Sequence, residues 1–402
     1  MKPVSACILT IGNELLFGET IDTNAAFIAQ QLTAAGVKIA RKATLPDTIA
    51  TIAQVVKNQE EDICIITGGL GPTDDDLTRQ ALARAFNTRL FPNQRQAKRI
   101  EAFFKRFKRP MAQSNYVQAL VPQGFAALDN DFGTAPMLFR KKPFICVLPG
   151  VPREARNLMT SAVLPLVQSH FRLTPIVHKE IKTTGIGESS LFDRIKDIAV
   201  PASITLAYLP EISGVVVRLS GRNTKAIVPL RNKIRARLRE YIYGRRGDTL
   251  ESVIQRIFIR KKLTLALAES CTGGLIASKL VAVPGSSRYF LGSVVCYSNA
   301  LKIKMAGVPK RVIQRYGAVS EETALAMTQG IRRKTGAGVA LSVTGIAGPG
   351  GGTKKKPVGT VCIACVSGHK RIVEKIQLFG GRSAIQERAA YTALNFIRKS
   401  VQ

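Results

Sequence analysis

The sequence predicts an α/β protein built from more than one domain. Apolar runs with the spacing of strands alternate with helical segments along most of the chain. Glycine-bearing turns directly follow several of these runs, as they do at the carboxyl ends of parallel strands. The chain has 402 residues, which is too many for one ordinary core, and its 46% apolar and 21% charged residues are typical of a folded globular protein.

The first section, residues 1–171, is expected to form a doubly wound α/β unit. Strands and helices alternate along it, and the first expected helix ends at Gly36, a residue type that often terminates helices. The expected strands are Ala6–Ile11, Val37–Lys42, Asp62–Thr67 and Phe144–Leu148, and the expected helices are Asn24–Ala35, Ile49–Lys57 and Gln94–Phe107.

The second section, residues 172–247, is short and mixes strands with helices, which predicts a compact α+β module. We expect strands at Ile176–Thr183, Ile204–Tyr208 and Gly214–Leu219, and helices at Ser189–Ile198 and Lys225–Arg239. The segment Tyr243–Gly247 contains two glycines and two arginines, and we interpret it as the linker to the third section.

The third section, residues 248–402, repeats the strand–turn–helix pattern and is expected to form a second α/β domain. Its long terminal helix and its apolar strands are sufficient for a core of its own. The expected strands are Leu263–Leu267, Ser293–Tyr297, Val339–Thr344 and Val358–Val366, and the expected helices are Leu250–Arg260, Leu275–Leu280, Glu321–Lys334 and Arg382–Lys399.

Cysteine usage and hydropathy indicate a reduced, cytoplasmic protein. No apolar run approaches the ~20 residues that a membrane helix needs, and the apolar start of the chain is too short for a signal peptide. The seven cysteines lie mostly inside apolar runs, which predicts buried thiols rather than disulfides. Cys362 and Cys365 have CxxC spacing, but a strand would send their sulfurs to opposite faces, which argues against a metal or redox site.

The net charge of +32 favours an anionic ligand. Residues 251–402 alone carry 24 basic and 6 acidic side chains. A positive field of this size attracts phosphorylated substrates or polyanions, although it is also compatible with a general bias of solvated surfaces. The chain has no tryptophan and lacks the alternation of aromatic and basic residues that single-strand platforms use, so a small nucleotide is favoured over nucleic acid.

A loop rich in glycine and aspartate follows the expected strand Asp62–Thr67. Glycine backbone there can cradle phosphate, and carboxylates can hold a divalent cation that bridges a phosphorylated ligand. The alternative is that one or two of the aspartates only cap the next helix. Together with polar residues that follow the first strand, the candidate N-terminal site comprises Glu14, Asp22, Asn24, Gly68, Gly69, Thr73, Asp75 and Asp76, with Asp76 as the metal ligand.

The turn Ala268–Gly274 is the segment of the third section that combines the most potentially nucleophilic side chains. It places the hydroxyl of Ser270, the thiol of Cys271 and a second hydroxyl between a strand and a helix. Its two glycines allow close approach of the backbone, and free amides at the helix start can bind an anion or an oxyanion. Small residues also suit a tight turn without any chemistry, so the turn alone does not decide between the two interpretations.

A hydroxyl nucleophile needs a base, and histidine is nearly absent from this chain. None of the three histidines, His170, His178 and His369, lies within these motifs. A lysine buried beside a hydroxyl can act instead, because burial lowers its pKa. We therefore expect Ser270 to pair with Lys302, assisted by Tyr297, and Cys271 to pack beneath the turn.

Together these motifs resemble the CinA family, and the resemblance covers essentially the whole chain. Gly69–Thr73 with Asp75–Thr78 and Leu148–Glu154 carry it in the first section. Ala268–Gly274, Val319–Thr323 and Val343–Gly352 carry it in the third.

The resemblance implies a molybdopterin-binding-like α/β/α domain, a KH-type middle domain and a nicotinamide-nucleotide amidase domain with α/β/α layers. It implies deamidation of nicotinamide mononucleotide through Ser270 and Lys302, with Tyr297 and Thr344 assisting and no cofactor. For the first domain it implies a metal-dependent ADP-ribose pyrophosphatase. We expect a homodimer, and the candidate substrate-binding residues of the amidase domain are Glu269, Thr272, Gly273, Gly274, Gly345 and Arg382. The alternative function is a nucleic-acid- or pterin-binding protein without amidase activity.

Overall fold

The computed structural model describes residues 3–402 and divides into two compact units, Met1–Val177 and His178–Gln402. Met1 and Lys2, the first residues of the expected N-terminal domain, lie outside the described residues. Within residues 3–402, no helix is long and apolar enough to cross a membrane. The prediction of a mixed α/β chain is confirmed.

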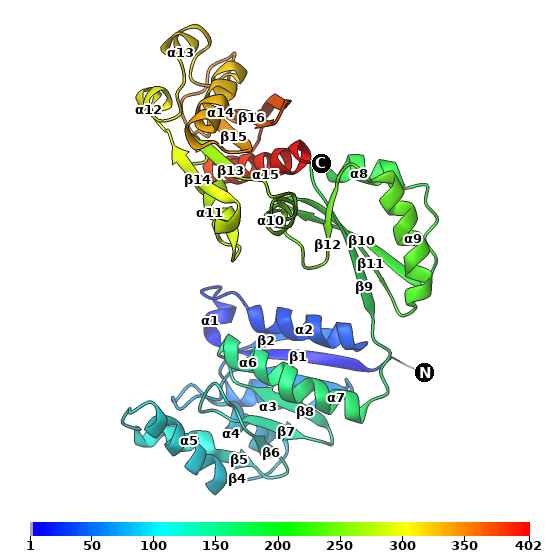
Figure 1. Ribbon diagram of the computed structural model, residues 1–402. Helices are drawn as coiled ribbons and strands as arrows, with labels where there is room; N and C mark the ends of the chain where they lie inside the picture. Colours follow the sequence, from blue (N-terminus) through cyan, green and yellow to red (C-terminus); the bar gives the residue numbers. More distant parts are fainter. Residues whose placement is uncertain (1–2) are drawn as a thin grey trace. The chain divides into compact units, whose positions relative to one another are not determined.

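The first unit is built on a six-stranded sheet with the order β2-β1-β3-β8-β7-β6 (Figure 1). The first four strands in this order are parallel, and β7 and β6 add antiparallel partners. The strands of the unit are β1 (Ser5–Ile11), β2 (Lys38–Leu45), β3 (Ile63–Thr67), β6 (Ala126–Leu128), β7 (Met137–Arg140) and β8 (Phe144–Leu148), with a separate ribbon of β4 (Leu90–Pro92) and β5 (Leu120–Pro122).

Helices cover both faces of this sheet because its strands alternate between two cores. On β1, Ala6 and Ile8 pack toward α2, α6 and α7, whereas Cys7 and Leu9 pack toward α3 and α4. The helices are α1 (Asn13–Leu16), α2 (Thr23–Ala35), α3 (Ile49–Lys57), α4 (Thr78–Ala85), α5 (Gln94–Arg106), α6 (Pro152–Leu158) and α7 (Leu164–His170), with a 3-10 turn at Gln113–Ala119 and a π turn at Met159–Val163. The carboxyl ends of β1, β3 and β8 therefore meet at one edge, where the candidate loops lie.

The middle of the chain forms a four-stranded sheet with the order β10-β11-β9-β12. Its elements are β9 (Val177–Thr183), α8 (Glu188–Ile195), β10 (Ile204–Glu211), β11 (Gly214–Gly221), α9 (Thr224–Arg237) and β12 (Ile242–Arg245). The expected linker Tyr243–Gly247 is wrong in its first half, because residues 242–245 pair with β9 and the Tyr243 side chain is buried. The strand was missed because Gly244 and Arg245 are residue types common in turns.

The C-terminal part of the second unit has a five-stranded sheet with the order β14-β13-β15-β16-β17 (Figure 1). Strands β14, β13 and β15 are parallel, and β16 and β17 are antiparallel additions. The elements are α10 (Leu250–Lys261), β13 (Leu265–Glu269), α11 (Leu275–Val281), a 3-10 turn (Ser286–Arg288), β14 (Phe290–Val295), α12 (Asn299–Lys304), α13 (Lys310–Tyr316), α14 (Glu321–Thr335), β15 (Val339–Gly345), β16 (Thr360–Ser367), β17 (Lys370–Gln377) and α15 (Arg382–Ser400).

This second sheet is also covered on both faces. Helices α10, α11 and α15 share the larger core with one face, and α14 packs on the other. Cys362 belongs to the α14 side and Cys365 to the α15 side, which confirms that the two sulfurs point to opposite faces. The buried guanidinium of Arg398 on α15 donates to the carbonyls of Glu240 and Ile242 and so ties this domain to the end of the middle sheet.

Candidate active site

The expected nucleophile, Ser270, directly follows β13 at the carboxyl end of the second parallel sheet. Its backbone amide donates to the Val343 carbonyl at 2.9 Å, so the residue is fixed against the neighbouring strand β15. The side chain is almost fully buried, with 6% of its surface exposed. This placement presents one hydroxyl at the strand-to-turn junction, where open α/β sheets bind their ligands.

Lys302 on α12 reaches the hydroxyl of Ser270. Its Nζ lies 2.9 Å from Ser270 Oγ and donates to the carbonyls of Cys296 at 3.1 Å and Tyr297 at 3.3 Å. The residue is 2% exposed, and all three acceptors are uncharged. Burial therefore lowers the pKa of the Lys302 ammonium below the usual lysine range, which favours the neutral amine that a general base requires.

Glu269 organises the turn rather than the ligand side of the cavity. It is fully buried, and its carboxylate accepts hydrogen bonds from the amides of Gly274, Ile276 and Ala277. The hydroxyls of Thr272 and Ser293 also donate to it. A carboxylate at a helix start offsets the helix dipole and the unpaired amides there, so Glu269 holds α11 in register with the end of β13.

Cys271 lies under the turn, as expected. Its side chain is 4% exposed, and burial raises the pKa of the thiol to about 12. The thiol consequently stays protonated near neutral pH and is a poor nucleophile. Its packing also explains Gly345, because a Cβ at that position would lie 3.1 Å from the sulfur and 2.9 Å from the Thr360 carbonyl.

Tyr297 and Arg382 form a second contact at the mouth of the site. The tyrosine side chain is 59% exposed, and its hydroxyl accepts a hydrogen bond from Arg382 Nη2 at 2.8 Å. Nη1 of the same guanidinium donates to the Gly348 carbonyl at 2.7 Å. Tyr297 thus contacts Lys302 through its backbone carbonyl, whereas its hydroxyl is directed to the arginine.

A cavity of about 170 Å³ lies over the Ser270–Lys302 pair. Thr344 lines it, and its hydroxyl donates to the Ala318 carbonyl at 2.8 Å. The complete lining is Ser270, Cys271, Tyr297, Asn299, Lys302, Ala318, Val319, Thr344, Gly345, Ala347 and Arg382. The volume lies below the ~300–1,000 Å³ of pockets that enclose whole drug-sized ligands, so it fits only part of a ligand of that size.

The structure brings all four candidate catalytic residues to this cavity, but only part of the candidate substrate-binding set. Gly345 and Arg382 line it, whereas Glu269, Thr272, Gly273 and Gly274 do not. Gly273 and Gly274 have φ values of +61° and +98°, so they serve the backbone of the turn. Ala318 and Val319, which form one wall, were not among the candidate site residues, although Val319 begins the motif Val319–Thr323 that carries part of the resemblance.

The candidate loops of the first unit enclose a larger cavity of about 460 Å³. Glu14, Gly68, Gly69, Asp75 and Asp76 line it, as the sequence predicts. Gly68 has a φ of +109°, and a Cβ there would lie 2.2 Å from the Ile11 carbonyl, so only glycine fits between β1 and β3. Asp47, Gln118 and Glu154 line the same cavity and were absent from the candidate set.

Three members of the candidate N-terminal site lie away from this cavity. Asp22 caps α2 by accepting from the Ala25 amide at 2.8 Å. Asn24 is buried and donates to the Gly150 carbonyl at 2.7 Å, which joins α2 to the loop after β8. Thr73 donates to Asp76 through its hydroxyl at 2.6 Å and its amide at 2.9 Å.

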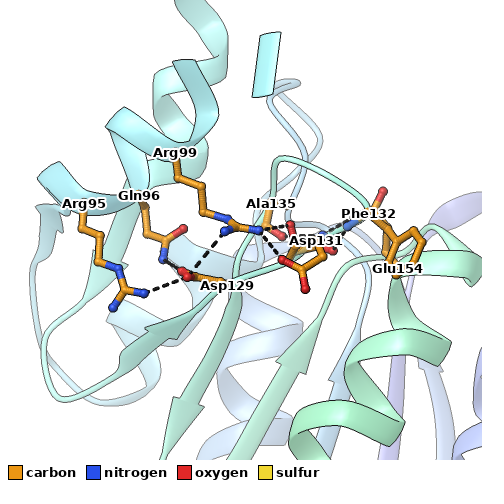
Figure 2. Close-up of polar contacts among 9 residues, drawn as sticks. Arg95, Gln96, Arg99, Asp129, Asp131, Phe132, Ala135 and Glu154 are labelled. Atoms are coloured by element: carbon orange, nitrogen blue, oxygen red, sulfur yellow. Dashed lines mark hydrogen bonds and ion pairs between the residues drawn. The ribbon is translucent and has the colours of Figure 1, made fainter. Parts of the chain in front are cut away.

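Glu154 is held at the cavity by the loop between β6 and β7 (Figure 2). Asn130 donates to Glu154 Oε2 at 2.6 Å and to the Ala135 carbonyl at 2.9 Å. Arg99 on α5 fixes this loop through the Asn130 carbonyl and Asp131. Burial raises the pKa of the Glu154 carboxyl, and the hydrogen bond from Asn130 partly offsets this shift.

The aspartate expected to bind metal is already engaged by protein donors. Asp76 accepts from the Gly71 amide through Oδ1, and Thr73 occupies Oδ2. Within residues 3–402, no group of three or more His, Cys, Asp or Glu side chains is arranged to hold a metal ion. Asp76 therefore orders the turn Gly71–Thr73 through these hydrogen bonds, and its role as a metal ligand stays a prediction.

Three protein-family models match the chain. They are the CinA C-terminal domain over residues 247–401, the probable molybdopterin binding domain over 7–169 and the KH domain of damage-inducible protein CinA over 178–244. Along the sequence, the molybdopterin binding match covers the six-stranded sheet, the KH match the four-stranded sheet and the CinA C-terminal match the five-stranded sheet.

Similarity to curated proteins extends over the full length. A CinA-like protein of Kosmotoga olearia is 36% identical over 99% of both chains. A CinA-like protein of Gemmatimonas aurantiaca is 40% identical over 98% of this chain and 95% of its own. Among solved structures, the competence/damage inducible protein CihA of Agrobacterium tumefaciens is 38% identical and covers 38% of this chain and 96% of its own, with a TM-score of 0.37.

Proposed function

The chain belongs to the CinA family, and we propose that its C-terminal domain hydrolyses the carboxamide of nicotinamide mononucleotide. The products are nicotinate mononucleotide and ammonia. The observation that carries this proposal is the buried Ser270–Lys302 pair, with Oγ and Nζ 2.9 Å apart in a cavity that has no histidine in its lining.

The charges around the cavity suit a substrate that carries a phosphate. The cavity accepts a group the size of an aromatic amide, so the ribose phosphate has to remain at its mouth. Arg382 lies there with guanidinium donors beyond the two that bind Tyr297 and Gly348. The 24 basic and 6 acidic residues of 251–402 provide an attractive field for the anion.

The chemistry follows from the lowered pKa of Lys302. The neutral amine takes the proton of Ser270 Oγ as the oxygen bonds to the carboxamide carbon. We assign the stabilisation of the resulting oxyanion to the backbone amides of the turn that follows β13. The lysine returns the proton to nitrogen, the C–N bond breaks and ammonia leaves. The same amine then takes a proton from water as the water oxygen bonds to the acyl carbon, and it returns this proton to Ser270 Oγ as the ester bond breaks.

The test is the release of ammonia from nicotinamide mononucleotide by the intact protein, with nicotinate mononucleotide identified as the second product. Free nicotinamide is the matched control, because it has the amide but no phosphate, and its turnover is expected to be much slower. Absence of ammonia from the mononucleotide overturns the proposal and favours the competing one, a nucleic-acid- or pterin-binding protein without amidase activity. Steep salt dependence of oligonucleotide binding would support that alternative.

The Cys271→Ala variant is expected to keep at least about one third of the wild-type kcat for the mononucleotide. The thiol is protonated and packs beneath the turn, so its loss removes apolar contacts rather than chemistry. A small cavity beside Gly345 lowers stability by about 1 kcal/mol, which urea unfolding measures. A kcat that falls as far as in the serine variant would instead identify the cysteine as the nucleophile.

We propose a second activity, hydrolysis of the diphosphate of ADP-ribose, for the N-terminal domain. The specific observation is the 460 Å³ cavity, which is lined by the glycine turn Gly68–Gly71 at the carboxyl end of β3. Several carboxylates also line it, so a diphosphate needs a divalent cation to enter. Because no group of metal-binding side chains is preformed among residues 3–402, we expect the divalent cation to enter together with the diphosphate and to neutralise part of its negative charge.

Asp76→Ala is expected to lower AMP release from ADP-ribose by about 100-fold, because it frees the Gly71 and Thr73 amides from the carboxylate that orders the turn. Asp74→Ala removes the neighbouring, exposed carboxylate and is the matched control, with activity within about twofold of wild type. AMP formation, measured with added Mg²⁺ and with EDTA, checks this. Equal activity of the two variants, or activity that EDTA leaves unchanged, contradicts the proposal.

A further inference from the structure

One lysine of the run Lys354–Lys356 is not a free surface side chain. The run lies in the loop between β15 and β16, where Lys354 and Lys355 are exposed. Lys356 is partly buried, and its Nζ donates to the carbonyls of Tyr316 at 3.0 Å and Val319 at 2.6 Å. Lys356 thus differs from its two neighbours in being held by backbone acceptors.

Both acceptors belong to the turn of residues 316–319, which connects α13 to α14. The other two carbonyls of this turn also accept from side chains. Gly317 accepts from Thr323 Oγ1 at 2.7 Å, and Ala318 accepts from Thr344 Oγ1 at 2.8 Å. All four carbonyls of the 316–319 turn are therefore fixed by side-chain donors from α14, β15 and the β15–β16 loop.

The 316–319 turn forms one wall of the cavity over Ser270. Ala318 and Val319 line this cavity, and Thr344 lines it while hydrogen-bonded to the turn. A turn has no ladder of backbone hydrogen bonds to hold it in place, so its position depends on these donors. Lys356 serves two of the four carbonyls, and the three donor hydrogens of its ammonium are enough to bind both at once.

We propose that Lys356 is a positioning residue for the amide-hydrolysing site. It holds the 316–319 turn, and through it the hydroxyl of Thr344, at a fixed distance from Ser270 Oγ, so that the bound carboxamide meets the nucleophile in a reactive orientation. Lys356 does not line the cavity and its Nζ is committed to carbonyls, so it acts on the wall rather than on the substrate phosphate. This inference rests on the proposed amidase function.

The test compares Lys356→Met with Lys355→Met. Both variants remove one positive charge from the same loop and keep an unbranched side chain, but only the first removes the two hydrogen bonds. For Lys356→Met we expect kcat for nicotinamide mononucleotide to fall by about 10- to 100-fold, since displacements of about 1 Å have effects of this size. Its KM is expected to stay within about threefold, and Lys355→Met is expected to match wild type within about twofold.

Two further measurements separate positioning from general loss of structure. Labelling of Ser270 by a small phosphonofluoridate is expected to proceed at the wild-type rate in Lys356→Met, because the Ser270–Lys302 pair is intact. Thr323→Val removes the shorter of the two hydrogen bonds to the Gly317 carbonyl, leaving that from Ser320 Oγ at 3.3 Å, without a change of charge. It is expected to lower kcat in the same direction even if the lysine variant does not fold.

The outcomes distinguish the two proposals. An active wild type with kcat unchanged in both Lys356→Met and Thr323→Val overturns the positioning role and leaves the amidase proposal standing. A raised KM with unchanged kcat in Lys356→Met also overturns it, because that pattern indicates a contact with the substrate phosphate. A wild type that releases no ammonia overturns the proposed function and the positioning role together.

Discussion

Replacing Ser270 by alanine is expected to lower kcat for ammonia release from nicotinamide mononucleotide by about 1,000-fold or more. The variant removes the oxygen that bonds to the carboxamide carbon, and removal of a nucleophile that works with a base has effects of this order or larger. The reaction cannot pass to the neighbouring Cys271, because burial keeps the pKa of that thiol at about 12. Coupled ammonia assays and direct detection of the nicotinate nucleotide measure the loss.

The fold of the Ser270→Ala variant is expected to persist. It loses one hydrogen bond, worth about 1 kcal/mol, and Lys302 keeps the carbonyls of Cys296 and Tyr297 as acceptors. Ser278→Ala is the matched control, because Ser278 is an exposed serine on α11, the helix that follows the turn. Retention of more than about one tenth of wild-type activity by Ser270→Ala would show that another atom attacks the substrate.

The layers of the two α/β domains could be predicted because their apolar runs are long and periodic. Strand β13, strand β15 and helix α15 were expected within about two residues of their observed bounds. The short elements were not, since α12 has six residues and β12 has four. Strand β17 has eight residues but was also missed, because its charged and apolar residues come mostly in pairs rather than in alternation. Such segments gain their structure from tertiary pairing, which local periodicity does not encode.

The parts of the candidate site that need a particular side chain could be predicted from the sequence. The parts formed by backbone groups could not. The shortage of histidine directed the interpretation to Lys302, whose Nζ indeed lies beside Ser270 Oγ. Backbone carbonyls bind the same amine and form the 316–319 turn. Every residue has a carbonyl, so the sequence cannot indicate which ones act. Glu269 was a candidate substrate-binding residue, but its carboxylate accepts hydrogen bonds from amides at the start of α11 that have no partner within the helix.

Replacing Lys302 by methionine is expected to lower kcat/KM for the mononucleotide by about 100- to 10,000-fold, the usual contribution of a general base. Only the neutral amine accepts the serine proton, so wild-type activity falls as the pH falls through the pKa of Lys302. Burial lowers that pKa, and the acid limb of the profile therefore lies below the ~10.4 of an exposed lysine. The limb is expected to disappear in Lys302→Met, and Lys302→Arg, which stays protonated, is expected to be equally impaired.

Lys304→Met is the matched control, because Lys304 is an exposed lysine on the same helix, and it is expected to keep wild-type activity and the acid limb.

Lys302→Met is also expected to stabilise the fold, and this effect distinguishes a catalytic lysine from a structural one. Lys302 is buried without a countercharge, so the native state binds its proton less readily than the unfolded chain does. That cost is absent above the unfolded lysine pKa, grows as the pH falls below it and becomes constant once the native amine is protonated. Urea unfolding of Lys302→Met and wild type should therefore diverge toward lower pH, with the methionine variant more stable. A variant that is inactive and also less stable at every pH would indicate that the lysine mainly supports the structure of the turn.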